Sequence, residues 1–499
     1  MSDDIILRLD PKVAFDSSLL EQAVLKASGT SDFAVLRRSI DSRRSRPVVE
    51  VLIRPNPDPA FIERPSVAAC LRGQVIIVGS GPAGLFAALE ALRQGLRPVI
   101  VEKGREVHQR RRDIAQYART GILDPISNYS FGQGGAGSFS DGKLYSRSKK
   151  RGDNDGALRT LVAFGADQAI LLDAHPHIGT DRLPAIIEAI TGFIQDNGGT
   201  VMLESEAVDL IMDAGRCSGV VLKSGQRLLG PVILAPGNAS RPLFRRLVEL
   251  GLPVQAKEIA VGMRLELPQR IVDENQYHGH CQDLPPAEFR YVTSSDGKGV
   301  YTFCMCPGGT VVPASSQAGH VAVNGMSASA RSSRWANSAF VTTLGVDETG
   351  FSGPLGVLEY QEKLERLAYE QGGSNGFAPA QRLKDYLEGR ASSDLPPSSY
   401  RPGLKPTMFS SWLDGFLDHR LRQGLESMIR AMPSFLCDEA ILIGMETCTS
   451  SPVRISRDPA TLQAVEGLYP AGEGAGYAGG IISSAIDGQR CAEALAKVM

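Results

Sequence analysis

Val75–Glu102 reads VIIVGSGPAGLFAALEALRQGLRPVIVE: a short apolar strand, a glycine-rich turn, an amphipathic helix and a second strand that ends in a carboxylate. Gly79 lets the strand turn sharply, Gly81 lets backbone N–H groups approach a pyrophosphate, and Gly84 lets the helix lie close to the sheet. The helix N-terminus favours phosphate because it carries the positive end of the helix dipole. Glu102 lies 18 residues after Gly84, near the spacing of about 20 for a carboxylate that binds ribose hydroxyls. This stretch therefore predicts a site for an adenine dinucleotide.

Length, charge and cysteine usage narrow the class of protein. The chain has 499 residues, a net charge of −2 and 8 cysteines. At about 100–200 residues per domain this length predicts two or three domains, and the small charge gives no general attraction to nucleic acid or anionic membrane. The acidic start MSDDIILRLD lacks the basic region of a signal peptide, and we expect no membrane span. Scattered cysteines without a CxxC pair fit a reducing, cytoplasmic location.

The patterns along the chain divide it into four segments. Residues 1–72 read as strand, helix and two strands, the β-α-β-β order of half a ferredoxin-like fold, followed by a proline-rich linker. Residues 73–262 and 436–499 are predicted to be two parts of one discontinuous, Rossmann-like α/β domain. Between them, residues 263–435 carry short alternating runs, which predict an inserted antiparallel, β-rich substrate domain. Within the insertion, Ala380–Leu387 is expected to be a helix.

The C-terminal segment favours flavin over nicotinamide. Gly467–Glu473, GLYPAGE, resembles the motif that closes FAD-binding domains. The resemblance implies that Glu473 holds a ribityl hydroxyl, while Gly472 lets the backbone come close. The helix that follows would begin near Gly480–Ile482 and aim its first amides at the flavin pyrimidine edge, where reduced flavin is negative. A nicotinamide enzyme needs no such second motif, so the expected cofactor is FAD.

A glycine loop is the next candidate for cofactor contact. Gly132–Lys143 reads GQGGAGSFSDGK, in which successive glycines expose N–H groups and Ser138, Ser140 and Lys143 add donors. This chemistry suits the flavin pyrophosphate or an anionic substrate. The small residues that follow the predicted strand Val232–Ala235 would also let the chain pass close to a cofactor.

Motifs across most of the chain after residue 72 carry a family resemblance. They are GSGPAG (79–84), FGQGGAGSFSDGKL (131–144), PHIGTDRL (176–183), FCMCPGG (303–309), VNGMS (323–327), TSSPVRISRD (449–458) and AGEGAGYAGG (471–480). With them the chain resembles the FAD-dependent dehydrogenases of largely unassigned substrate, distant relatives of glutathione-reductase-type and geranylgeranyl-reductase-like flavoproteins. The resemblance implies a glutathione-reductase-type fold and FAD, but no particular reaction.

Taken together, these motifs predict a set of cofactor-binding residues. The set is Gly79, Ser80, Gly81, Pro82, Ala83, Gly84, Glu102, Lys103, Gly134, Gly135, Ser138, Ser140, Lys143, Val208, Ala235, Gly237, Gly472, Glu473, Gly480, Ile481 and Ile482.

No catalytic acid or base stands out from the sequence. The pairs His175/His177 and His278/His280 have the spacing of one strand face, but a metal site would need further ligands, and none is expected. Cys304 and Cys306 are read as two ordinary small side chains on one strand face. Glu446 is expected to be a solvated carboxylate at a strand end.

These features predict an FAD-dependent oxidoreductase that exchanges hydride with a small organic substrate. The middle of the chain has no second strand–GxGxxG–helix unit for a nicotinamide domain, and the chain has no CxxC pair, which disfavours the disulfide reductases. Electrons would come from NAD(P)H, a protein donor or the substrate. Two alternatives stay open. The arginine cluster RRSIDSRRSR (37–46) would suit an RNA-modifying flavoenzyme, and a non-catalytic flavin-bound sensor or scaffold would use the N-terminal unit for interactions.

Overall fold

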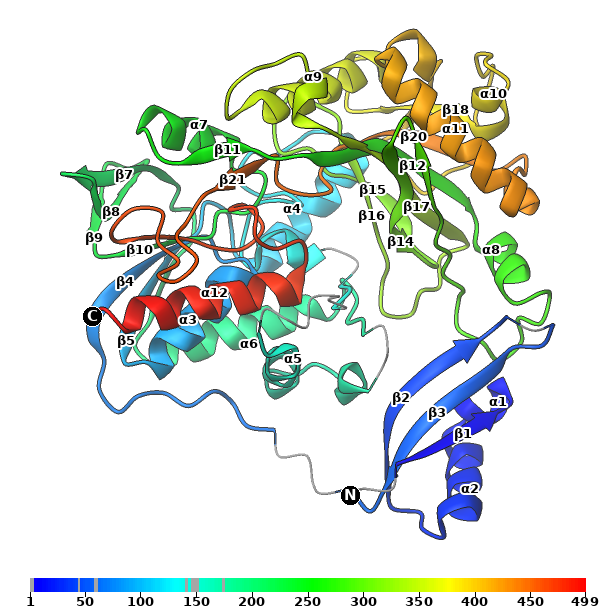
Figure 1. Cartoon of the computed structure of the whole chain (residues 1–499), viewed down its shortest axis with the longest axis horizontal. Coiled ribbons are helices and arrows are strands. Elements are labelled where there is room, and N and C mark those ends of the chain that lie inside the picture. The colour runs from blue at the N-terminus through cyan, green and yellow to red at the C-terminus, as the bar shows by residue number, and fades with distance from the viewer. Residues whose placement is uncertain (1–3, 44, 58–61, 140–141, 145–151, 173–175) are drawn as a thin grey trace.

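The computed structural model describes residues 4–43, 45–57, 62–139, 142–144, 152–172 and 176–499. Ser140 and His175 lie outside these described residues. The protein is a mixed α/β structure with several sheets, and Figure 1 shows them as three bodies: a small N-terminal sheet, a parallel sheet with its helices, and a large sheet covered by further helices. None of the helices in the described residues is long and apolar enough to cross a membrane.

The N-terminal unit is a three-stranded antiparallel sheet with the order β1-β3-β2, packed against helices. Its elements run in the predicted order with one further short helix, α1. They are β1 (Ile5–Leu9), α1 (Pro11–Phe15), α2 (Ser17–Ser28), β2 (Phe33–Asp41) and β3 (Val48–Pro55). Asp16 caps α2 by accepting from Leu19 N at 2.9 Å. The unit touches the large sheet's body through His278, whose Nε2 lies 2.9 Å from Ser42 O.

A five-stranded parallel sheet has the order β22-β10-β4-β5-β6. Its strands are β4 (Arg72–Val78), β5 (Leu96–Val101), β6 (Thr200–Met202), β10 (Val232–Leu234) and β22 (Leu468–Pro470). Since β22 pairs with β10, the C-terminal segment returns to the sheet that begins with the glycine fingerprint.

Both faces of the parallel sheet are covered, as its apolar strands require. Val75 and Ile77 pack on the helices α3 (Pro82–Arg93), α5 (Asn154–Ala163), α6 (Leu183–Asp196) and α12 (Ile481–Ala496). Ile76 and Val78 point to the other face, because side chains alternate along a strand. That face carries β7 (Ala207–Asp213), β8 (Arg216–Leu222), β9 (Arg227–Leu229) and α7 (Arg241–Glu249).

The second large sheet has seven strands in the order β13-β14-β17-β12-β20-β18-β19. All neighbouring pairs are antiparallel except β18 and β19. The strands are β12 (Ile259–Pro268), β13 (Val292–Ser295), β14 (Lys298–Cys306), β17 (Trp335–Leu344), β18 (Ala378–Arg382), β19 (Leu404–Pro406) and β20 (Ile441–Glu446). The central strand β12 is buried along its whole length.

Further elements surround this seven-stranded sheet. The hairpin of β15 (Thr310–Pro313) and β16 (Val323–Met326) lies beside it, with helices α8 (Gln269–Gln276), α9 (Gly356–Gln371), α10 (Leu383–Leu387) and α11 (Gly415–Ala431). Helix α4 (Val107–Thr120) contacts β15 of this hairpin and α6 of the parallel-sheet body. The ribbon of β11 (Val254–Ala256) and β21 (Val453–Ile455) joins the two large bodies (Figure 1). The chain enters the body of the seven-stranded sheet through β11 and leaves it through β21. Both connections therefore run through one antiparallel pair.

The expectation of a helix over Ala380–Leu387 is wrong for its first three residues. These belong to β18, in which Ala380 pairs with Ile443 of β20, and the helix begins only at Leu383. Pairing with a strand far along the chain outweighs local helix propensity here.

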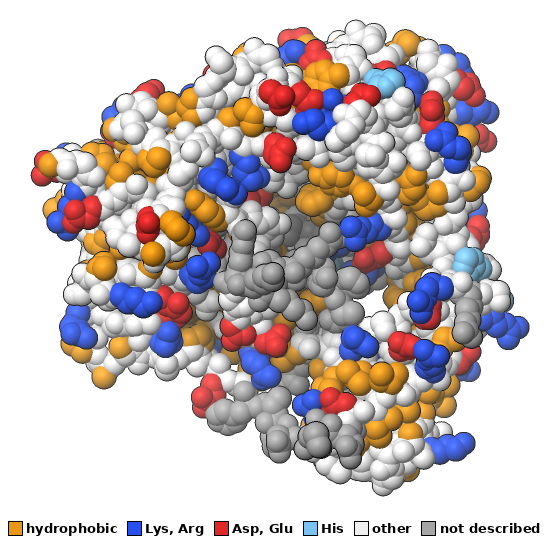
Figure 2. Space-filling model, viewed as in Figure 1, with side chains coloured by type: hydrophobic (Ala, Val, Ile, Leu, Met, Phe, Trp, Pro, Cys, Tyr) orange, Lys and Arg blue, Asp and Glu red, His pale blue; other side chains and the backbone are white. Residues whose placement is uncertain are grey.

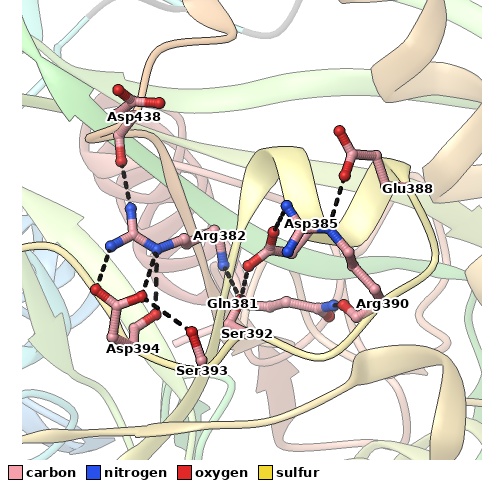
Figure 3. A network of polar contacts seen from close by, with 9 residues as sticks. All are labelled: Gln381, Arg382, Asp385, Glu388, Arg390, Ser392, Ser393, Asp394 and Asp438. Carbon is pink, nitrogen blue, oxygen red and sulfur yellow. Dashed lines mark hydrogen bonds and ion pairs between the residues drawn. The ribbon is translucent and has the colours of Figure 1, made fainter.

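A polar network closes the turn that follows β18 (Figure 3). Arg382 donates to Asp394 Oδ2 and to the carbonyl of Asp438, both at 2.7 Å. The buried Asp385 accepts from Ser392 Oγ at 2.6 Å and pairs with Arg390 at 2.5 Å. These bonds stabilise the strand-to-helix junction.

Candidate functional site

A cavity of about 370 Å³ lies where the two large sheets face each other. On one side it is lined by residues at the carboxyl ends of four parallel strands, Val78, Val101, Ala235 and Ala471. This end of an open parallel sheet is where α/β folds bind ligands. On the other side it is lined by residues of β14, β15 and β16 and of the segment after β20.

The cavity collects most of the predicted cofactor residues. Those on its wall are Gly79, Gly81, Pro82, Ala83, Glu102, Lys103, Gly135, Lys143, Val208, Ala235, Gly237, Glu473, Gly480 and Ile481. The set comes from six separate stretches of the chain.

Six other predicted residues do not line the cavity. They are Ser80, Gly84, Gly134, Ser138, Gly472 and Ile482. The contacts of Gly84, Gly472 and Ser138 are with other parts of the protein. Gly84 serves close packing, because a Cβ there would lie 1.9 Å from the carbonyl oxygen of Gly79. Gly472 donates its N–H to Asp487 Oδ2 at 2.8 Å, and Ser138 Oγ donates to Gln133 O at 3.0 Å.

Bare backbone faces the cavity at positions where a side chain would project into it. A Cβ on Gly237 would meet nothing within 4 Å, and on Gly81 and Gly480 nothing closer than 3.8 and 3.9 Å. Gly81 and Gly480 are the N-cap residues of α3 and α12, which pack against each other. The first amides of a helix have no acceptor within the helix, so two helix N-termini offer donors to the same cavity. This cradle fits the phosphates and polar ring edge of a flavin dinucleotide.

Glu102 connects three glycine-containing segments at one end of the cavity. Its Oε2 accepts from Ser80 N at 3.0 Å and Ser80 Oγ at 2.8 Å, and its Oε1 accepts from Gly104 N at 2.9 Å and Gly132 N at 3.0 Å. Such bonds to an ionised group are about twice as strong as neutral ones. Glu102 thus holds the fingerprint turn against the loop at 132–143.

We expect Glu102→Ala to lower the affinity for FAD at least tenfold. Each hydrogen bond to a charged group contributes about 1.5–3 kcal/mol, and about 1.4 kcal/mol corresponds to tenfold in binding. The measurement is flavin retained per protein after gel filtration, followed by titration of the apoprotein with FAD. Glu249→Ala, which removes an exposed partner of Arg246 on α7, is the control. Equal occupancy in both variants would contradict the role of Glu102.

Arg110 is a supporting residue that the sequence did not single out. Its guanidinium is fully buried. It donates to the carbonyls of Asn128, Tyr129, Gly132 and Gln133 and to Ser138 Oγ, at 2.9–3.2 Å. Burial lowers the pKa of Arg110 to about 10, an effect that the charge of Glu102 partly offsets. Arg110 therefore holds the conformation of the loop that forms one wall of the cavity, through hydrogen bonds from the inside of that loop.

Glu473 lines the cavity beside a second residue that the sequence did not indicate. Asn238 Nδ2 donates to Glu473 Oε1 at 2.8 Å. Burial raises the pKa of Glu473 to about 7, while the bond from Asn238 and the charge of Lys257 act in the opposite direction. A carboxyl of this kind can hold or release a proton near neutral pH. Asn238 follows Gly237 in the chain and belongs to no motif that identifies it. Its role is recognised only from its contact with Glu473 in the structure.

Lys143 lines the cavity, and its ammonium also links the glycine loop to the large sheet. Nζ donates to the carbonyl of Met305 on β14. Lys103 lies 4.2 Å from the ring centroid of Phe131 and pairs with Glu206 at 3.2 Å. Both cations are therefore already held by the protein.

The large sheet supports its side of the cavity with a buried charge cluster. Arg264 Nε lies 3.2 Å from Glu446 Oε2, and the two side chains are 0% and 1% exposed. Arg264 also donates from Nη1 to Asn337 Oδ1 at 3.3 Å and from Nη2 to the carbonyl of Cys304 at 2.9 Å. The expectation that Glu446 is solvated is wrong. Burial raises its pKa to about 7, against the attraction of Arg264.

Cys304 and Cys306 do not share a regular strand face as expected. The β14–β17 register shifts between Phe303 and Cys306, and Cys304 has φ +46°. This bulge places Cys304 on the cavity wall, while Cys306 is buried in the interior. Neither forms a disulfide.

Among the described residues, none of His177, His278, His280 or the arginines of the cluster at 37–46 lines the cavity. His177 forms a strand bridge with Lys143, which does line it. His278 and His280 occupy a turn after α8, not a strand. Within the described ranges, no group of three or more His, Cys, Asp and Glu could hold a metal ion. In the N-terminal unit Arg43 pairs with Asp41 at 2.7 Å. Figure 2 shows basic and acidic side chains interspersed over the visible face.

Two protein families match the chain. Residues 74–116 match the family described as "FAD binding domain", and residues 258–449 match "FAD-dependent protein, C-terminal domain-like". An uncharacterized protein of Clostridium beijerinckii (strain ATCC 51743 / NCIMB 8052) is 37% identical over 432 residues, which is 85% of this chain and 80% of the relative.

Similar solved structures include three flavoprotein-related chains. A geranylgeranyl bacteriochlorophyll reductase-like protein from Thermoplasma acidophilum is 14% identical, with a TM-score of 0.36 over 86% of this chain and 79% of that chain. E. coli quinol fumarate reductase FrdA is 12% identical, with a TM-score of 0.39 over 86% of this chain and 70% of that chain. CtdE in complex with FAD and a substrate is 13% identical, with a TM-score of 0.33 over 85% of this chain and 80% of that chain. At these TM-scores the likeness defines neither a site nor a substrate.

Proposed function

Because this chain belongs to a family of FAD-dependent proteins, we propose that it is an oxidoreductase that transfers hydride between FAD and a small organic substrate held against the seven-stranded sheet. The observation that carries the proposal is the single cavity shared by the glycine fingerprint, the Glu473 segment and the wall of β14–β16. Bound flavin supplies the hydride chemistry itself, and the protein supplies binding, orientation and exclusion of water.

The cofactor would lie along the carboxyl end of the parallel sheet. Glu102 and Lys103 would meet the adenosine end, and the first turn of α3 would meet the pyrophosphate. Glu473, oriented by Asn238, would hold a ribityl hydroxyl, with the amides of α12 at the pyrimidine edge. The cavity wall at each of these positions supports the assignment.

The substrate would meet the side of the cavity that the large sheet provides. Phe303 and Val312 offer apolar surface that excludes water, and Asn324 and Thr449 offer an amide and a hydroxyl that orient a polar group. The segment leading to Thr449 is fixed from behind, because Thr447 Oγ1 donates to the buried Glu365 at 2.7 Å. A fixed wall of this kind favours one orientation of the reacting carbon.

The test is reduction and reoxidation of the purified protein. We expect yellow protein with an absorbance maximum near about 450 nm, as for oxidised flavin. Under anaerobic conditions NADH, NADPH or a member of a metabolite panel should reduce it, and a second metabolite should reoxidise it. Protein that takes up FAD but exchanges electrons with no member of the panel would contradict the proposal and would favour a sensor or scaffold.

A pair of glycine variants connects turnover to this cavity. Gly81→Val places a side chain where the bare backbone faces the cavity and should yield folded, colourless, inactive protein. The control is Gly192→Val on α6, where a Cβ meets nothing within 4 Å but which does not line the cavity. Flavin content and turnover should match wild type in the control. Full flavin content in Gly81→Val would contradict the placement.

A further inference from the structure

A second cavity, of about 510 Å³, adjoins the first. The two share Phe303 and Thr449 as lining residues. Phe303 is 38% exposed, so an apolar residue lies at the junction between the two cavities. A molecule in the second cavity can therefore extend one end into the first.

Two cations lie on the wall of this second cavity. Lys257 is half-buried, and its Nζ has only long hydrogen bonds, 3.4 Å to Ser450 Oγ and 3.5 Å to the carbonyl of Ser451. Arg454 is exposed, with Nη2 3.4 Å from the carbonyl of Gly476 and its guanidinium 5.3 Å from the ring centroid of Tyr477. Among the residues that the structure describes, neither cation has a carboxylate within ion-pair distance.

The fold places these cations together for a definite reason. Lys257 directly follows β11, and Arg454 is in β21, where it pairs with Gln255 of β11. Lys257 N also donates to the carbonyl of Pro452 at 2.9 Å, which extends the ribbon by one bond. Because both chain crossings form this ribbon, the spacing of the two cations is set by backbone pairing.

The local electrostatics favour an anion there. Burial lowers the pKa of Lys257, and the nearby positive charge of Arg454 lowers it further. The charges of Glu473 and Glu258 act in the opposite direction, and Glu258 lines the same cavity. An anion between the two cations would relieve their repulsion and gain two charge-assisted contacts.

We propose that this cavity binds an anionic group, a carboxylate or a phosphate, of the molecule that exchanges hydride with the flavin, with Lys257 and Arg454 as its binding residues. The inference rests on the proposed function and specifies its substrate class. The anion would lie on Lys257 and Arg454 while the reacting carbon passes Phe303 into the first cavity. A carboxylate substrate and a dinucleotide phosphate donor share this chemistry.

The experiment is a titration of the oxidised, FAD-loaded protein, followed by the change in flavin absorbance. One arm uses NADP⁺ and the other uses acetate, succinate and benzoate separately. In at least one arm we expect saturable binding that weakens as salt is raised. Saturation in the NADP⁺ arm assigns the anion to a phosphate, and saturation in the other arm assigns it to a carboxylate.

Charge-removing variants then identify the residues. Lys257→Met and Arg454→Met should each raise the Kd of the responding probe at least tenfold, while Lys26→Met, on the exposed end of α2, should leave it unchanged. Wild-type Kd in both variants, or no response in either arm, would overturn the inference. FAD content and reduction by dithionite are measured in parallel. If both stay normal, such a failure concerns the anion site and not the flavin function.

Discussion

Arg110→Met is expected to give protein that does not retain FAD and whose free energy of unfolding is lower by about 3 kcal/mol or more. The guanidinium is the shared donor for the loop at 128–138. Without it several buried carbonyls lose their donor, and each such loss costs about 1–3 kcal/mol. The Gly132 backbone lies against this side chain, since a Cβ there would be 2.4 Å from Arg110 Cδ.

The loss should extend to the cofactor because the same loop reaches Glu102. Gly132 N donates to Glu102 Oε1 while its carbonyl accepts from Arg110. A loop that is no longer held would leave Gly135 and Lys143 out of place on the cavity wall. Urea unfolding with and without added FAD measures both effects.

Neighbouring arginines on the same helix provide the control. Arg111→Met changes an exposed residue of α4 and should leave stability and flavin content at wild-type values. Arg110→Lys retains a charge but has fewer donors in a different geometry, so it should fall between wild type and Arg110→Met. Normal flavin retention in Arg110→Met would show that the loop does not depend on this side chain.

Arg264→Met is expected to destabilise the protein by about 3–5 kcal/mol at pH 8, because it leaves the Glu446 carboxylate buried without its cation. It also removes a donor to the Cys304 carbonyl at the bulge, which accepts in addition from the Sγ of Cys306. We therefore expect weaker substrate binding as well as lower stability. Chemical unfolding at several pH values, with flavin absorbance as a second signal, measures the effect.

The effect of Arg264→Met should depend on pH in a predictable direction. The pKa of Glu446 is about 7 in the folded protein, above its usual value of 4.5. Between these values the folded state binds more protons than the unfolded state, so this group lowers the free energy of unfolding as pH rises from about 4.5 to about 7. Without Arg264 the pKa rises further, so the penalty in Arg264→Met should be smaller at pH 6 than at pH 8.

Removing both partners of the pair separates charge from packing. The double variant Arg264→Met with Glu446→Leu should recover most of the stability lost in Arg264→Met, because no unpaired buried charge remains. Glu446→Gln alone should reduce the dependence of stability on pH between about 5 and 7. A loss in the double variant as large as the sum of two single losses would contradict this account.

The features that depend on residues close together in the chain could be predicted from the sequence. The strand, turn and helix around Gly79–Gly84 follow from local spacing. FAD could be inferred because two such local motifs occur in one chain, at residues 79–84 and 467–473. Short-range backbone geometry is sufficient for these inferences.

The polar residues that support the site could be identified only from the tertiary structure. The three consecutive arginines at 110–112 look alike in the sequence. Only the structure shows that Arg110 is the buried one, because its hydrogen-bond partners lie outside its own helix. The sequence predicts a solvated Glu446, whereas the pairing of β20 with β12 buries it beside Arg264. Lys257 and Arg454 likewise meet only because β11 and β21 pair. Burial and charge pairing arise from contacts between distant segments, and the local pattern does not contain them.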